Sequence, residues 1–139
     1  MLEDLALQPL DTGTALSLWE RADDLSQPRR ALALLAAASA RTEEELARMP
    51  LGRRDAALLR VHALTFGAAL ECVATCAGCG AQTALPFDAG GTLWSEAAAS
   101  AQRLLQDVHA LASAYHWSEA DILALSPARR GYYLECLAG

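Results

Sequence analysis

The chain has 139 residues, of which 53% are hydrophobic, and its formal net charge is −6 at pH 7. The length is enough for one compact domain with a hydrophobic core, and the apolar fraction excludes a disordered chain. The negative charge argues against nucleic acid as the main partner. No run of about 18 apolar residues is present, so we expect no membrane span. The first four residues are acidic where a secretory signal would be basic, and all basic residues are arginine, as in a GC-rich genome. Together these features predict a bacterial cytoplasmic protein.

The first part of the chain, residues 1–69, has the sequence pattern of four helices. Residues 1–11 contain scattered leucines and are expected to form a loosely tethered arm, which could pair with or dock on another surface. Capping residues and apolar spacing then predict the helices that follow. Thr42 and Glu45 form a capping box for the third of them, and Gly67 is expected to end the fourth. They cover residues 12–22, 28–40, 43–48 and 52–66. On these helices Arg29 and Arg30 are expected to stay solvated, and His62 is expected to lie on the surface.

Residues 70–88 are the only part of the sequence that predicts strands. Two short runs flank Cys76-Ala77-Gly78-Cys79-Gly80, and Gln82 to Phe87 would form the return strand. The C-x-x-C-G spacing is that of the knuckle in zinc ribbons, where two thiolates converge on one ion. The glycine after the second cysteine accepts a backbone bend that is closed to other side chains. The sequence therefore predicts one small β-hairpin with a zinc-ribbon-like knuckle.

A structural zinc ion needs four ligands, and the knuckle supplies Cys76 and Cys79. The candidates for the other two ligands are Cys72 and Cys136. In an extended strand Cys72 would lie about 13 Å from Cys76, too far to share the ion, whereas a coiled segment would bring it closer. Cys136 could fold back from the last helix. The alternative is a tight hairpin with reduced thiols and no metal.

Two other cysteine chemistries fit the sequence less well. The C-x3-C-x2-C spacing from Cys72 through Cys76 to Cys79 matches radical SAM enzymes, but these need a βα barrel longer than this chain. A thioredoxin-like redox pair opens a helix after a strand, and Gly78 and Gly80 oppose a helix here. The sequence also lacks hydrolase, phosphate-loop and metalloprotease motifs. We therefore expect a protein without enzymatic activity.

The most strongly patterned stretch lies in the C-terminal unit, residues 95–139, which follows the glycine turn Ala89-Gly90-Gly91. One long helix and two short helices, capped by Ser118 and Ser126, are predicted. They cover residues 96–116, 119–125 and 127–137. Trp117 is expected to plug the core between them, and Arg129 and Arg130 are expected to lie in a solvated turn.

The C-terminal pattern also carries a resemblance to a known family. The segment from Val108 to Leu134 has the pattern V-H-x-L-A-x-x-Y-x-W-S-x-x-D-I-L-x-L-x-x-x-R-R-x-x-Y-L. This pattern resembles the C-terminal module of small proteins encoded among tail and baseplate genes of contractile-tailed phages and phage-like contractile injection systems. Leu18-Trp19-Glu20 resembles the leucine-tryptophan-glutamate pattern in the first helix of the same proteins, several of which have a C-x-x-C-G hairpin in mid-chain. The resemblance implies a structural or chaperone-like assembly protein that binds other tail or baseplate proteins and can enter a phage-like particle.

We therefore expect a single, mainly α domain over residues 1–139. It would be a helical bundle with one small inserted β-hairpin at 70–88, which joins the N-terminal helices, 1–69, to the C-terminal unit, 95–139. The expected partners are proteins, not nucleic acid or a membrane, and an oligomer is compatible with the sequence. The alternative function is a cytosolic zinc-ribbon adaptor or regulatory protein unrelated to tails.

Overall fold

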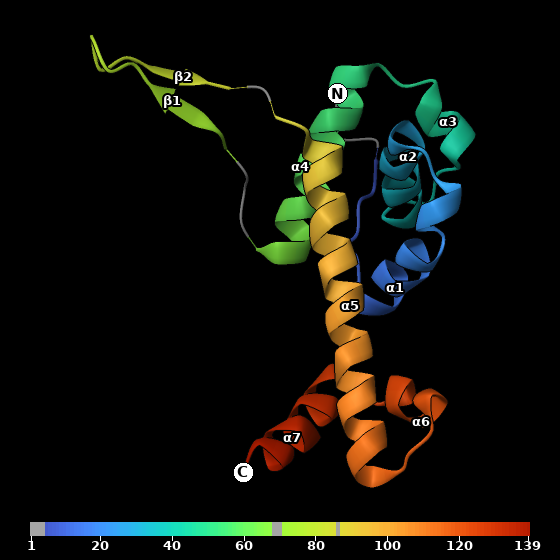
Figure 1. Cartoon of the computed structure of the whole chain (residues 1–139). Coiled ribbons are helices and arrows are strands. Elements are labelled where there is room, and N and C mark those ends of the chain that lie inside the picture. Colours follow the sequence, from blue (N-terminus) through green and yellow to red (C-terminus); the bar gives the residue numbers. More distant parts are fainter. Residues whose placement is uncertain (1–4, 68–70, 86) are drawn as a thin grey trace.

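The computed structural model describes residues 5–67, 71–85 and 87–139, and this part of the chain is mainly helical, as predicted (Figure 1). It contains seven α-helices, one 3-10 turn and one two-stranded antiparallel hairpin. Within these residues no helix combines the length and the apolar composition needed to cross a membrane. In chain order the elements are α1 Thr12–Glu20, η2 Ala22–Asp24, α2 Gln27–Ala37, α3 Glu43–Ala47, α4 Leu51–Phe66, β1 Val73–Thr75, β2 Gln82–Ala84, α5 Ala89–Tyr115, α6 Glu119–Ala124 and α7 Pro127–Ala138.

The long helix α5 is the element on which the rest of the fold is assembled (Figure 1). Its first half packs against α1, α2 and α4, and its last turns contact α6 and α7. Buried residues recur along its whole length, from Leu93 through Ala101 and Leu104 to Leu111. A helix of 27 residues is about 40 Å long, so α5 connects the N-terminal helices to the C-terminal unit as one continuous rod.

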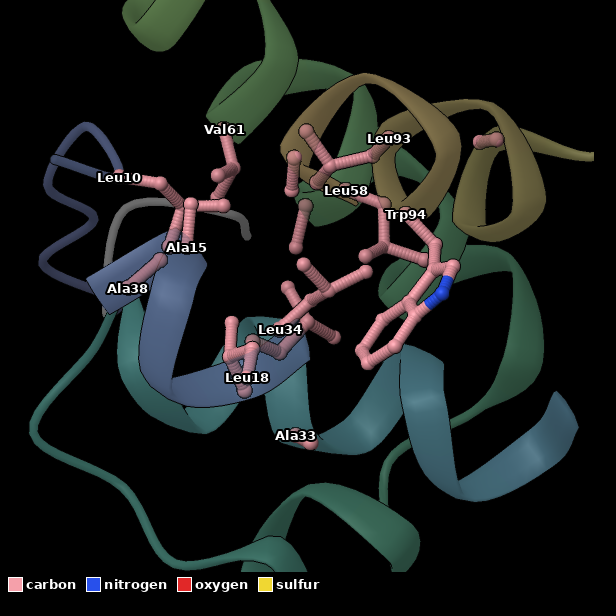
Figure 2. Close-up of a cluster of buried hydrophobic side chains, with 14 of the residues drawn as sticks. Leu10, Ala15, Leu18, Ala33, Leu34, Ala38, Leu58, Val61, Leu93 and Trp94 are labelled. Carbon is pink, nitrogen blue, oxygen red and sulfur yellow. The ribbon is translucent and has the colours of Figure 1, made fainter. Parts of the chain in front are cut away.

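The main core lies between α1, α2, α4 and α5 (Figure 2). Leu34, Leu58, Val61 and Leu93 are each at most 2% exposed, and the Trp94 indole packs beside them. Two smaller clusters continue along α5. They are formed by Leu16, Ala101 and Leu104, and by Val108, Leu111 and Ile122. The removal of these aliphatic side chains from water is the main source of stability.

The first turn of α5 corrects one prediction. Ala89-Gly90-Gly91 belongs to the helix and does not form a turn that separates two parts of the chain. The Asp88 carboxylate caps the helix by accepting the Gly91 backbone N–H at 2.9 Å. Gly90 faces α2, and a Cβ atom there would come within 3.2 Å of the Ala31 Cβ. Gly90 therefore allows a close contact between α5 and α2, for which sequence pattern alone gives no signal.

The segment before α1 is docked on the body. The Gln8 N–H donates to the Ala38 carbonyl at 2.8 Å, and the Leu10 N–H donates to the Thr65 hydroxyl at 3.0 Å. The Leu10 side chain is part of the main core. The prediction of a loosely tethered arm is thus wrong for residues 5–11, while the residues before them lie outside the described part. These hydrogen bonds join the segment to α2 and α4, which are distant in sequence.

Two arginines that were predicted to be solvated bind carbonyl groups at the end of the preceding helix. The Arg30 guanidinium lies 4.9 Å from the Trp94 ring centroid and donates to the Leu25 carbonyl at 3.1 Å. Arg130 is 7% exposed and donates to the Leu125 carbonyl at 3.3 Å. Both predictions are wrong for the same reason, since each side chain reaches back to unpaired carbonyls. The pattern L-S-x-x-R-R, present twice in the sequence, marks this arrangement.

The capping box predicted at the start of α3 is confirmed. The Thr42 hydroxyl accepts the Glu45 N–H at 3.2 Å, and the Glu45 carboxylate accepts the Thr42 N–H at 2.9 Å. The hydrogen bond from the Thr42 backbone is the main reason why the pKa of Glu45 is lowered, with help from the Thr42 hydroxyl and the Arg41 charge. Both partners therefore stabilise the helix start.

We expect Thr42→Ala to lower the free energy of unfolding by about 1 kcal/mol, because the Glu45 N–H loses its acceptor. The carboxylate adds a pH dependence. Since the folded-state pKa of Glu45 is lower than the unfolded one, its stabilisation is complete above the unfolded value of 4.5 and is lost as the pH falls through the folded value. Urea unfolding should thus show wild type more stable than Glu45→Gln at pH 7 and equal to it in acid. An equal difference at both pH values would contradict this assignment.

Candidate functional site

The cysteine knuckle lies at the tip of a hairpin that projects from the helices (Figure 1). Strands β1 and β2 pair in antiparallel register, with Ala74 opposite Thr83. Between residues 71 and 85 every residue is exposed except Ala74, which is half-buried. The return strand ends at Ala84, before the predicted end at Phe87, and Phe87 packs against the main core instead. Leu70 and Pro86, which were also assigned to the hairpin, lie outside the described residues. The helices thus leave the tip open to other molecules.

The tip has the tight turn that the C-x-x-C-G motif predicts. The Cys76 N–H donates to the Ala81 carbonyl at 2.8 Å, and the Cys76 carbonyl accepts the Gly80 N–H at 2.9 Å. Gly80 has a φ angle of +73°, in the left-handed region that favours glycine. The role predicted for this glycine is confirmed. The turn brings Cys76 and Cys79 close together.

Hydrogen bonds at the tip favour the ionised form of one thiol. The backbone N–H groups of Cys79 and Gly78 donate to the Cys76 sulfur and, with the Cys79 thiol, hold the pKa of Cys76 below its usual range. A thiolate is both the metal-binding and the nucleophilic form of cysteine. Two adjacent thiols of this kind can supply half of a tetrahedral site for a soft metal ion.

The other two candidate ligands lie apart from this pair. Cys72 precedes β1, and because β1 is extended, Cys72 is separated from Cys76 by about 13 Å along the strand. Cys136 belongs to α7, which lies at the far end of α5 from the hairpin (Figure 1). In the described part of the chain, no three His, Cys, Asp or Glu side chains gather in a way that could hold a metal ion. The structure thus brings together Cys76 and Cys79 only.

A buried polar contact between α4 and α5 was not predicted. His62 is 3% exposed, and its Nε2 atom lies 2.5 Å from the Glu96 carboxylate. The prediction that His62 lies on the surface is therefore wrong, because α5 covers this face of α4. The sequence offers one signal, since Glu96 is the only acidic residue in the small-residue stretch from 89 to 101. This contact satisfies a polar group at a helix interface.

The C-terminal unit is built around an aromatic cluster. Trp117 stacks on Tyr115 with ring centroids 4.7 Å apart and meets Tyr133 edge-on at 5.0 Å. These rings pack against Ile122, which is fully buried. Trp117 joins α5 to α7, as predicted, and stays half-buried. The cluster fixes the two short helices to the end of α5.

Some large apolar side chains of this unit are left exposed. They are Leu123, Tyr132 and Leu137. Tyr132 is 65% exposed, and tyrosine is one of the residues that most often dominate protein interfaces. Val73 and Leu85 are exposed in the same way on the hairpin. Both ends of α5 therefore present apolar groups that a partner protein could cover.

Comparison with protein families, curated proteins and solved structures finds no match to this chain. Its function is therefore inferred from its own residues and from the resemblance of its sequence patterns. The exposed knuckle and the C-terminal unit are the two places where those residues suggest binding.

Proposed function

We propose that the chain is a non-enzymatic structural or chaperone-like assembly protein of a phage-type contractile tail or injection-system baseplate. It acts by binding other tail proteins. The observation that carries this proposal is the pattern from Val108 to Leu134, which resembles the C-terminal module of such proteins. The proposal includes incorporation into a phage-like particle.

In the folded chain, the segment from Val108 to Leu134 has an interior and an exposed surface, and this supports its use as a recognition module. Val108, Leu111 and Ile122 form its interior, and Trp117 and Tyr133 cover them. These side chains account for the fold of the unit, not for binding. Tyr132 falls at an open position of the pattern and points outward on α7. We therefore assign partner binding to this exposed surface.

The hairpin offers a second contact. A two-stranded hairpin of this size has little stability alone, and each of its strands has an open edge that can accept another chain. It lies near the start of α5, whereas the C-terminal unit lies at the end of this helix (Figure 1). Because α5 is about 40 Å long, one copy of the chain can hold two tail proteins at a fixed separation.

The test is co-expression of the tagged chain with the sheath, spike and baseplate proteins encoded in the same genome. We expect at least one of them to co-purify, and Tyr132→Ala to weaken its binding about tenfold, which corresponds to about 1.4 kcal/mol. Glu135→Ala is the matched control, because it shortens an exposed polar side chain on the same helix. Retention of no tail protein would overturn the proposal.

The same experiment tests the alternative, a cytosolic zinc-ribbon adaptor or regulatory protein unrelated to tails. The observation in its favour is the turn at Cys76 and Gly80, which has the backbone bonds of a zinc knuckle. Such a protein would retain DNA at moderate salt or bind regulatory proteins, and it would not bind tail proteins. The acidic net charge of −6 opposes retention of DNA.

A further inference from the structure

Among the residues that the structure describes, no third His, Cys, Asp or Glu side chain joins the two thiols at the hairpin tip. All cysteines and histidines of the chain belong to the described residues. Cys72 is held away by β1, and Cys136 lies on α7. His62 is buried against Glu96. The remaining histidines, His109 and His116, lie at the far end of α5, so any further cysteine or histidine ligand for the tip must come from another molecule.

The tip is suited to contact with a second molecule because it is exposed and uncharged. Residues 72–85 contain no Asp, Glu, Lys, Arg or His, in a chain of which 20% of residues are charged. Two copies of an acidic protein repel each other through the negative charges of their helical parts. The projecting hairpin, with Val73 and Leu85 exposed, is a part of the surface where this repulsion is weakest.

We propose that the hairpin tip is half of a zinc site, and that two copies of the chain complete it with Cys76 and Cys79 from each. Four thiolates then bind one Zn2+ ion in the tetrahedral arrangement that structural zinc prefers. A two-fold axis passes through the ion, so the contact closes as a dimer and cannot extend into a filament. Each thiol that binds releases its proton to solvent.

The backbone and the composition of the tip also suit zinc. A site with four thiolates and one Zn2+ carries two negative charges, which need compensation. The Gly78 backbone lies beside the Cys76 sulfur, since a Cβ atom built on Gly78 would come within 3.9 Å of this sulfur, and peptide dipoles at the turn can supply the compensation in both copies. Residues 72–85 hold no carboxylate that would compete with the thiolates for the ion. The zinc half-site does not rest on the proposed function.

The test measures zinc content and molar mass together on the full-length protein, purified with a reducing agent and equilibrated with Zn2+. We expect half a zinc ion per chain and a dimer by light scattering. Excess chelator should give a zinc-free monomer, and Zn2+ should restore the dimer. In the sample equilibrated with Zn2+, a monomer with one zinc per chain or a monomer without zinc would overturn the proposal. A dimer that survives the chelator would overturn it as well.

The four cysteines provide matched variants, because all are exposed. Cys76→Ser and Cys79→Ser should each abolish both zinc binding and the dimer. Cys72→Ser and Cys136→Ser should retain half a zinc per chain and the dimer. Three of these cysteines belong to the hairpin, outside the helical core, and Cys136 is exposed on α7, so all four variants should keep the far-UV circular dichroism of wild type. Loss of zinc in Cys72→Ser would contradict the two-copy site, since the ion would then have a third ligand in one chain.

Discussion

Leu34→Ala is expected to lower the free energy of unfolding by about 3 kcal/mol. Leu34 is fully buried in the main core, where it lies close to α4 and α5 (Figure 2). The substitution removes apolar area from the core and leaves a cavity that the surrounding helices cannot fill completely. Because domains are stable by about 5–15 kcal/mol, this one change would take away a large fraction of the total.

Urea unfolding followed by circular dichroism measures this effect through the midpoint of the transition. Leu64→Ala is the control, because Leu64 is an exposed leucine on α4. It should change stability by no more than about 0.5 kcal/mol. Equal losses in the two variants would contradict the assignment of the main core.

Ile122→Ala is expected to destabilise the C-terminal unit by about 3 kcal/mol, with a smaller effect on the main core. Ile122 is fully buried, and α6 and α7 make their main contacts with α5. The loss of this side chain should therefore open the unit locally before the whole protein unfolds. Amide hydrogen exchange measures the two regions separately.

In the Ile122→Ala variant, we expect the amides of residues 119–138 to exchange much faster and those of α2 and α4 to change little. Leu123→Ala is the control, because Leu123 is next to Ile122 in the sequence and its side chain is exposed. Equal acceleration in both regions would show that the C-terminal unit and the main core unfold together. The zinc half-site proposed at the hairpin should be unaffected in either variant.

Helix boundaries were predictable where local chemistry decides them. The Thr42 capping box, the N-cap hydroxyls of Ser118 and Ser126, and Gly67 at the end of α4 are all present as predicted. Each of these signals acts within about four residues of the helix end. The tight turn at Gly80 belongs to the same class, because the required φ angle is a property of one residue.

The wrong predictions for His62 and for the segment before α1 have a different cause. The His62–Glu96 contact joins residues 34 apart, and the hydrogen bond from Leu10 to Thr65 joins residues 55 apart. Such pairs depend on how helices pack, which the apolar pattern of each helix does not specify. The same limit applies to the candidate metal site. Local spacing predicts that the two knuckle cysteines meet, whereas the position of Cys136 follows from the whole fold.

The central place of α5 has a consequence for synthesis on the ribosome. Helices α1, α2 and α4 are all made before α5, yet Leu93 and Trp94 complete their core. At roughly 5–20 residues per second, the nascent chain exposes these apolar faces for a few seconds until the first turns of α5 emerge. The N-terminal helices therefore fold late during translation, and this interval is when a chaperone would be most useful to the nascent protein.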